Sequence, residues 1–332
     1  MPPCIRVKSA VYDPVLRAYT NQQSAAAAAA AGTPPPPPPV RIYMRRVALV
    51  LCTSSVHCVT LGSGLPPAVP SKILGPPAHF DGMQVGTQYL SMSRECSVSG
   101  ASIQCEVVRL ASRPACFHVG GLLSDAECDA IVASAHALGM EPATTAGGDN
   151  RCGCGVAWVP VASNEVASSV SAACEQLFLQ PEVLEPSTDW ASAGRWENMQ
   201  VLKYAEGGEF KLHYDSNEQV HRVCTVLIYL NGVGSTWFPL ALRDPKDAQS
   251  VGGANPPRQA ALAAAERLSP SREDGLVVTP RKGDAVAFYN YMNDGSAQVD
   301  RLALHAGLPA PAEKSIASLW VRPHPALRLS CA

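Results

Sequence analysis

Four short and mostly apolar segments lie in the second half of the chain, at 199–204, 223–230, 284–289 and 315–321, and from residue 198 onward the pattern changes from a helical period to a period of two. A period of two predicts β-strands, and the second segment is also rich in β-branched and aromatic residues. Glycine and proline separate the segments, and no helical pattern lies between them. This arrangement favours an antiparallel barrel or sandwich. A further strand is expected at 106–110.

Helical patterns occur upstream of these strands. Ser124 and Glu127 form a capping box, in which the serine hydroxyl caps a backbone N–H and the glutamate reaches back. Apolar residues then recur at helical spacing until Gly139, and a second such pattern runs from about Glu165 to Leu179. The fold class predicted is therefore mainly β with flanking helices (α+β), with the helices N-terminal to the β core.

Residues 1–104 differ in composition from the rest. They contain a poly-alanine run at 25–31 and a hexaproline at 34–39, and 66–100 is rich in Pro, Gly and Ser. Such tracts cannot bury varied apolar surface, so we expect disorder or linker there and a folded domain at 105–324. Residues 325–332 form a short tail.

A segment at 44–65 begins with Met44-Arg45-Arg46 and continues mostly apolar. This is the pattern of a signal or anchor segment if Met44 is the true start, which would direct the protein to the endoplasmic reticulum and secretory pathway. Otherwise a cytoplasmic location is expected. Membrane association is expected only through this segment.

The stretch Ala241 to Asp274 interrupts the strand pattern and is rich in Ala, Pro and Arg. It predicts an inserted loop with a short helix near Gln259 to Leu268. Two interpretations stay open. The insertion closes over a bound substrate, where its arginines and lysine meet an anionic or polar group, or it is a tolerated surface insertion.

Composition narrows the function. Only 16% of residues are charged and the net charge is −2, which argues against a nucleic-acid partner because phosphate contacts need clustered Lys and Arg. The 47% of hydrophobic residues support a sizeable core. The 12 cysteines are too sparse for a disulfide scaffold and lack zinc-finger spacing, so their disulfide state stays open.

Candidate chemistry begins at His213-Tyr214-Asp215, directly after a predicted strand. Residues i and i+2 of an extended chain project to one face roughly 7 Å apart, so the imidazole and the carboxylate can chelate one cation. His305 would complete a 2-His-1-carboxylate set, as in non-haem Fe(II) oxygenases. The pair alone is weak evidence, because a surface or capping histidine explains it equally well.

The surrounding segments add specificity. In chain order they read Gln200-Val201-Leu202-Lys203-Tyr204, Arg222 to Asn231, Ser235-Thr236-Trp237-Phe238-Pro239, Pro280 to Phe288, Leu304-His305-Ala306-Gly307 and Glu313 to Trp320. This set resembles the catalytic domain of the prolyl 4-hydroxylase alpha-subunit family over about residues 105–324. Members are Fe(II)- and 2-oxoglutarate-dependent dioxygenases on a double-stranded β-helix (jelly-roll), so the resemblance implies that core here.

The resemblance also implies roles for individual residues. His213, Asp215 and His305 match the iron ligands, which are also the catalytic residues. Four positions match residues that bind 2-oxoglutarate in the family. Lys314 matches the residue that pairs with its distal carboxylate, and Tyr204 and Thr236 match residues that hydrogen-bond the same end. Trp320 matches an aromatic residue of the pocket wall. Three of these roles have an alternative. Lys314 could instead be a solvated lysine at a strand edge, and Tyr204 and Trp320 could simply pack in the core. O2 as cosubstrate, release of succinate and CO2, and ascorbate (vitamin C) as reductant follow from the resemblance.

Two departures bear on the substrate. The turn Gly234-Ser235-Thr236 is shorter than in the family, and Ser216 to His221 is too short for the loop that folds over a peptide. A proline-rich peptide substrate is therefore in doubt, and a related hydroxylase of a free amino acid, small molecule or non-proline side chain is the alternative. A catalytically silent β-helix binding module is the alternative of another class. The partner is expected to be a peptide, protein or small-molecule substrate, and the oligomeric state is open.

Overall fold

A computed structural model describes residues 5–9, 75–86, 88–143, 151–179, 196–217, 220–243, 255–271, 274–294 and 296–322. The poly-alanine and hexaproline runs, the segment 44–65 and the tail 325–332 lie outside these residues. In the described part no helix is long and apolar enough to span a membrane.

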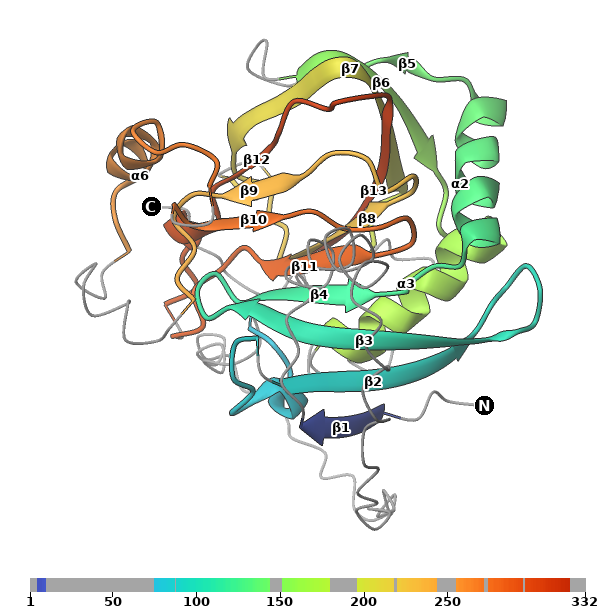
Figure 1. Cartoon of the computed structure of the whole chain (residues 1–332), viewed down its shortest axis with the longest axis horizontal. Coiled ribbons are helices and arrows are strands. Elements are labelled where there is room, and N and C mark those ends of the chain that lie inside the picture. The colour runs from blue at the N-terminus through green and yellow to red at the C-terminus, as the bar shows by residue number, and fades with distance from the viewer. Residues whose placement is uncertain are drawn as a thin grey trace, which may run out of the picture. The chain divides into compact units, whose positions relative to one another are not determined.

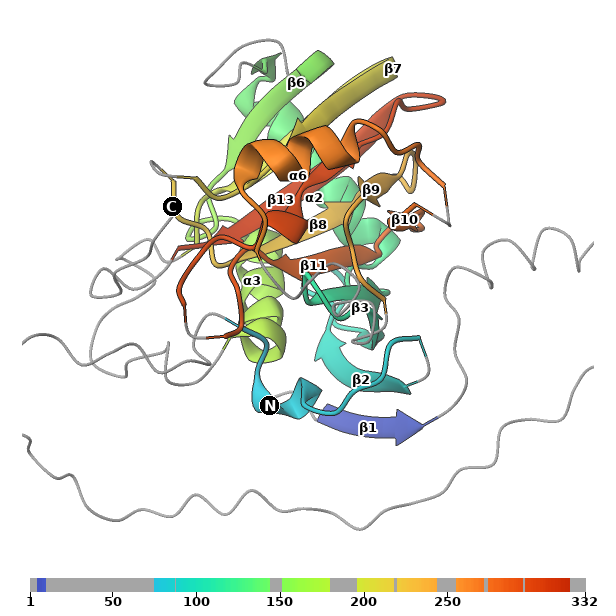
Figure 2. The same ribbon diagram turned by 90° about the vertical axis from the view of Figure 1, so that its left-hand side faces the viewer.

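The described elements are mainly strands, joined in one curled antiparallel sheet (Figures 1 and 2). The strands are β1 Ile5–Ser9, β2 Gln88–Glu95, β3 Ser102–Ala111, β4 Cys116–Gly120, β5 Glu141–Pro142, β6 Arg151–Val159, β7 Met199–His213, β8 Cys224–Tyr229, β9 Thr236–Phe238, β10 Leu276–Val278, β11 Ala285–Tyr289, β12 His305–Gly307 and β13 Lys314–Val321. The helices are η1 Ala78–Phe80, α2 Asp125–Leu138, α3 Glu165–Phe178, α6 Arg258–Ala265 and η3 Arg301–Ala303.

The long strand β7 connects two layers. Its first half pairs with β6 and β13, in the larger layer that continues through β8, β11, β4, β3 and β2. Its second half pairs with β12, which continues through β9 to β10 in the smaller layer. The two layers face each other as in a double-stranded β-helix, which is the predicted fold class.

Alternation along the strands decides what each face of the larger layer contacts. On β8, Val226 and Ile228 join the core that contains the helices, whereas Tyr229 joins the cluster between the two layers. On β13, Ala317 and Leu319 lie in the first core and Ile316 in the second. The period of two seen in the sequence therefore separates a helix-covered face from a face that lines an interior cavity.

The two predicted helices are confirmed. Ser124 caps α2 through the Glu127 backbone N–H, and Glu127 returns a bond to the Ser124 N–H, so the capping box is complete. Asn164 caps α3 through the backbone N–H of Ala167. Apolar residues of both helices, such as Ile131 and Leu177, are buried against the larger layer.

The expected start of order near residue 105 is wrong, because 75–104 contributes to the described fold. β2 pairs with β3 over its whole length, and Phe80 of η1 stacks near Phe117 and Phe178. Arg94 forms a buried ion pair with Glu127. The Pro- and Gly-rich composition suggested a linker, yet a few large apolar residues such as Leu90 and Met92 are enough to hold this segment.

The insertion contains the expected helix, which begins at Arg258 and ends at Ala265. β9 precedes the insertion and β10 follows it, and the two strands pair with each other. The predicted strands are also present, but β7 extends nine residues beyond its predicted end at Tyr204. This extension carries His213 to the interior cavity.

Candidate functional site

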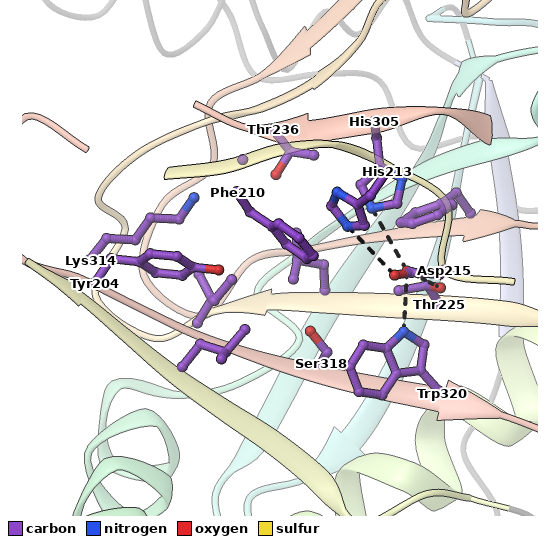
Figure 3. A pocket seen from close by; sticks show the side chains of 15 residues that line it. Tyr204, Phe210, His213, Asp215, Thr225, Thr236, His305, Lys314, Ser318 and Trp320 are labelled. Atoms are coloured by element: carbon purple, nitrogen blue, oxygen red, sulfur yellow. Dashed lines mark hydrogen bonds and ion pairs between the residues drawn. The ribbon is translucent and has the colours of Figure 1, made fainter. Parts of the chain in front are cut away.

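The structure brings His213, Asp215 and His305 together (Figure 3). His213 ends β7, and His305 begins β12 directly opposite it in the register. The ligand atoms of the three residues lie within 4.8 Å of one another. Asp215 Oδ1 is 3.7 Å from His213 Nε2, and its Oδ2 is 3.8 Å from His305 Nε2. These separations leave room for one cation at the centre.

Hydrogen bonds orient both imidazoles. His213 Nδ1 bonds the carbonyl of Lys211 at 2.7 Å, and His305 Nδ1 bonds the carbonyl of Ala303 at 2.9 Å. A carbonyl only accepts, so each Nδ1 must carry the proton. Each Nε2 then presents a lone pair toward Asp215, which is the form that a metal ion requires.

Asp215 is held by donors on its far side. Its Oδ2 accepts the hydroxyl of Thr225 at 2.8 Å and the indole N–H of Trp320 at 3.2 Å. Asn290 in turn donates to the Thr225 hydroxyl oxygen at 3.0 Å. Burial would raise the pKa of Asp215, but the charges of His305 and His213 in their protonated forms, together with Arg222 and the Thr225 hydroxyl, outweigh burial and lower that pKa below the usual range. The carboxylate is therefore fixed and ionised.

Lys314 lies at the other end of the cavity from the three ligands (Figure 3). Its side chain is almost fully buried, with 2% of the residue exposed. Burial lowers the pKa of its ammonium to about 8. Among the residues that the structure describes, no carboxylate lies within ion-pair distance of it. A buried cation without an acidic partner is costly, and an incoming carboxylate would compensate it.

Gly234 makes room for this lysine. It adopts a φ of +83°, and a Cβ there would lie 2.6 Å from Lys314 Cδ. Glycine is thus required by backbone conformation and by space. The shortened turn at 234–236 is the feature that brings the backbone against the Lys314 side chain.

Tyr204 and Thr236 line the same cavity, near Lys314. Lys314 Nζ lies 5.6 Å from the centre of the Tyr204 ring. The Thr236 hydroxyl shares a hydrogen bond with the buried phenol of Tyr229, a residue that the sequence analysis did not single out. Both positions can therefore contact a ligand that reaches Lys314.

Phe210 lies in the cavity between Lys314 and the metal-facing residues (Figure 3). Its ring stacks on His213 with the centroids 3.5 Å apart. The β7–β12 register shifts between the two residues, and this irregularity directs both side chains to the cavity although they are three residues apart. About 30 Å³ remains free, which admits a water or two but not 2-oxoglutarate.

A cationic and aromatic rim lies beside Asp215. The guanidinium of Arg222 stacks 3.6 Å from the Trp320 ring centre and forms two 2.8 Å hydrogen bonds to Glu197. Trp158, which is 44% exposed, lies 6.2 Å from Trp320. Neither Arg222 nor Glu197 was assigned a role from the sequence, although Arg222 begins one of the segments that carry the family resemblance.

The donors present fit an iron ion and a dicarboxylate. Two neutral imidazoles and one carboxylate match the facial set of non-haem Fe(II) oxygenases, and a buried lysine in the same cavity matches a carboxylate-bearing cosubstrate. A double-stranded β-helix with this set inside defines an oxygenase of that class.

Comparison with known proteins agrees. The sequence model of the 2OG-Fe(II) oxygenase superfamily matches residues 199–322. Prolyl 4-hydroxylase 2 of Arabidopsis thaliana is 28% identical over 70% of this chain and 76% of its own length. The probable prolyl 4-hydroxylase 4 of the same plant is 30% identical over 65% of this chain and 70% of its own length. The crystal structure of a viral collagen prolyl hydroxylase from Paramecium Bursaria Chlorella virus-1 is 20% identical, covering 63% of this chain and 96% of that one with a TM-score of 0.40.

The chain therefore belongs to the prolyl 4-hydroxylase family of 2-oxoglutarate- and Fe(II)-dependent oxygenases. It is a 2-oxoglutarate-dependent dioxygenase, and the family implies Fe(II), 2-oxoglutarate and O2 as its cofactor and cosubstrates.

Proposed function

We propose that this dioxygenase hydroxylates a C–H bond of a peptidyl proline, with Fe(II) held by His213, Asp215 and His305. The observation that carries the proposal is one cavity with three oriented metal-facing groups at one end and the buried Lys314 at the other. No carboxylate among the described residues lies within ion-pair distance of this lysine. When bound, Fe(II) with 2-oxoglutarate and O2 supplies the oxidation of the C–H bond and yields succinate and CO2.

The chain's own residues then bind and orient. Lys314 pairs with the distal carboxylate of 2-oxoglutarate, and Tyr204 and Thr236 donate hydrogen bonds to that end. Thr225 and Trp320 keep Asp215 Oδ2 occupied, which directs Oδ1 to the metal. Apolar residues that line the cavity, such as Leu202, Phe288 and Ile316, exclude water from the reaction.

For the substrate, the rim beside Asp215 supports a peptide. Arg222 is fixed by Glu197 and by stacking on Trp320, so its remaining N–H groups form a rigid donor for a backbone carbonyl. The exposed Trp158 adds an apolar surface that suits a proline ring. The names of the relatives, which are prolyl 4-hydroxylases, point in the same direction.

A free amino acid or small molecule is the second candidate. It is favoured by the short connection between Asp215 and β8, in which the Asn217 N–H already closes a turn on the Val220 carbonyl. A connection this short cannot fold over a peptide from that side. The choice between the two substrates decides what the insertion has to do.

Further parts of the proposal rest on the family resemblance or on the sequence. Ascorbate would restore the iron to Fe(II) after uncoupled turnover. We propose that the catalytic domain begins near residue 75, where the described residues resume after β1, and ends near 322. Residues 44–65 would direct the chain to the secretory pathway if they act as a signal or anchor segment.

Succinate release by the purified protein tests the function. The assay contains Fe(II), 2-oxoglutarate and ascorbate, with proline-containing peptides in one arm and free amino acids in the other. We expect substrate-dependent succinate with the peptides, and a mass gain of one oxygen on proline. Succinate release with free amino acids but not with peptides would show that the substrate is a free amino acid. No iron-dependent succinate release with any substrate would contradict the enzyme assignment.

A further inference from the structure

The orientation of His305 depends on the short helix η3. The carbonyl that accepts its Nδ1–H belongs to Ala303, the last residue of η3. If η3 shifted, this carbonyl would shift with it, and the Nε2 lone pair would no longer point to the metal position. The contacts that hold η3 therefore bear on the metal site.

Three side chains hold η3 from different directions. Asp300 caps it by accepting the Leu302 N–H at 2.9 Å. Tyr214, which lies between the two ligands His213 and Asp215, donates its hydroxyl to the Arg301 carbonyl at 2.9 Å. Asn255 accepts the Arg301 N–H on its Oδ1 at 2.9 Å and donates its Nδ2–H to the Val299 carbonyl at 2.8 Å.

Asn255 belongs to the insertion, and it is itself anchored. Its Oδ1 also accepts Arg113 Nη2 at 3.1 Å, while Arg113 Nε donates to Asp300 at 3.1 Å. At the start of the insertion, Leu242 exchanges backbone hydrogen bonds with Arg113. One arginine thus ties the first residues of the insertion, and Asn255 in its interior, to the capping residue of η3.

The residues after Asn255 are stiff. Pro256 and Pro257 follow, and Pro257 is the N-cap of α6. Prolines at this point reduce the freedom of the unfolded chain and fix the direction in which α6 begins. Arg258, the first residue of α6, lies 5.8 Å from the centre of the Tyr214 ring. The described part of the insertion therefore packs on the metal-ligand segments.

We propose that Asn255 is a positioning residue for the iron site, which acts on His305 through η3. The inference rests on the proposed metal site and goes beyond it, because it assigns a task to the insertion that neither the sequence motifs nor the family pattern contains. The insertion is then part of the shell around the ligands. Outer-shell partners of metal ligands typically contribute 10–100-fold in metal affinity.

The test measures metal binding in the absence of turnover, with anaerobic Fe(II) or with Co(II) as the titrant. Asn255→Ala should weaken binding about tenfold and change the visible absorption spectrum of bound Co(II), which reports ligand geometry. Asn255→Asp keeps the acceptor for Arg301 and Arg113 and loses only the donor to Val299, so its metal affinity should lie between those of Asn255→Ala and wild type. Gln259→Ala, at an exposed position of α6, is the matched control and should change nothing.

Wild-type affinity and an unaltered Co(II) spectrum in Asn255→Ala would overturn the inference, as would an Asn255→Asp variant as weak as Asn255→Ala. Failure of the wild-type protein to bind either metal would instead contradict the proposed iron site, so the two failures are distinguishable.

If Asn255→Ala does not fold, hydrogen exchange of the wild-type protein decides. Metal loading should then slow the amides of 299–303 and also those of α6. Protection confined to the ligands and their immediate neighbours would contradict the coupling to the insertion.

Discussion

Trp320 donates its indole N–H to Asp215 at 3.2 Å, to the same carboxylate oxygen that accepts the Thr225 hydroxyl. The family resemblance predicted only that Trp320 forms part of the pocket wall. In the structure it lines the pocket and also occupies one oxygen of the carboxylate. The other oxygen, Oδ1, is left for a cation, which favours a single metal–oxygen contact from Asp215.

Trp320→Phe should weaken Fe(II) binding about tenfold, because the ring is kept but the donor to Asp215 is lost. Equilibrium binding of Fe(II) without oxygen measures the effect. Trp158→Phe is the control, since the Trp158 ring lies near Trp320 without contacting the carboxylate in any described hydrogen bond. Equal affinities for the two variants would show that the indole N–H does not help to hold the ligand.

Replacing a metal ligand should have the largest effect. His305→Ala, like His213→Ala or Asp215→Ala, should abolish iron-dependent succinate release because two remaining ligands cannot hold Fe(II) in place. Zn(II) and Cu(II) should bind the wild-type site more tightly than Fe(II) and inhibit, following the affinity order of divalent metals. Full turnover by His305→Ala would remove that residue from the site.

Lys314→Ala should lower the affinity for 2-oxoglutarate by two to three orders of magnitude or so. Breaking one side of a buried charge pair costs roughly 3–5 kcal/mol, and about 1.4 kcal/mol corresponds to tenfold. Iron affinity should stay near wild type, because Lys314 is at the opposite end of the cavity. Calorimetric titration of both ligands separates the two effects, and unchanged cosubstrate affinity would contradict the role.

The pH dependence of 2-oxoglutarate binding follows from the same lysine. Burial lowers the pKa of free Lys314 to about 8, whereas a bound carboxylate would raise it. Affinity should thus be full well below pH 8 and should fall as the pH rises through that value, with proton uptake on binding. Lys314→Met should show weak affinity without this dependence. A wild-type affinity that is flat between pH 7 and 9 would contradict the argument.

Phe210→Ala should make 2-oxoglutarate bind faster and with lower KM. The ring stacks on His213 and leaves only about 30 Å³ free, so the cosubstrate must displace it before reaching the metal. The apparent affinity equals the intrinsic affinity multiplied by the fraction of molecules in the open, binding-competent state. Stopped-flow association measures the step, and Phe210→Leu should lie between alanine and wild type. A slower association in Phe210→Ala would mean that the ring guides the cosubstrate instead.

A chain that begins at residue 75 should fold cooperatively, whereas one that begins at residue 100 should not. The shorter chain lacks β2 and Arg94, which leaves the fully buried Glu127 without its cation. An uncompensated buried charge costs roughly 3–5 kcal/mol, comparable to much of the stability of a domain. Thermal unfolding of both chains tests this, and equal melting temperatures would show that β2 is dispensable.

Local signals account for the parts of the fold that the sequence predicted correctly. The capping box at Ser124 defined the start of α2, and short apolar runs bounded by Gly and Pro identified β8, β11 and β13. β2 was missed because the Pro-, Gly- and Ser-rich composition around it outweighed a short alternation, in which Leu90 and Met92 are the apolar positions. The extension of β7 was missed because Gly207 and Gly208 interrupt alternation, although the strand continues past them.

The site shows a similar division. His213, Asp215 and His305 could be named because family motifs place them, but their mutual orientation could not, since it depends on carbonyls of Lys211 and Ala303. Thr225, Phe210 and Arg222 have no local signal. Their roles arise only when β7, β8 and β13 lie side by side. The part of the insertion that contacts η3 is likewise a tertiary relationship.

The anchoring of Leu242 and Asn255 to Arg113 also has a practical consequence for engineering. Leu242 and Asn255 are fixed points, so the gap that the chain between them must close is set by the fold rather than by its length. Loop-closure entropy rises only slowly with length, by about 0.6 kcal/mol for each doubling. A reporter domain inserted between Leu242 and Asn255 would therefore join two points that Arg113 already holds, and Asn255 contacts the helix that orients His305.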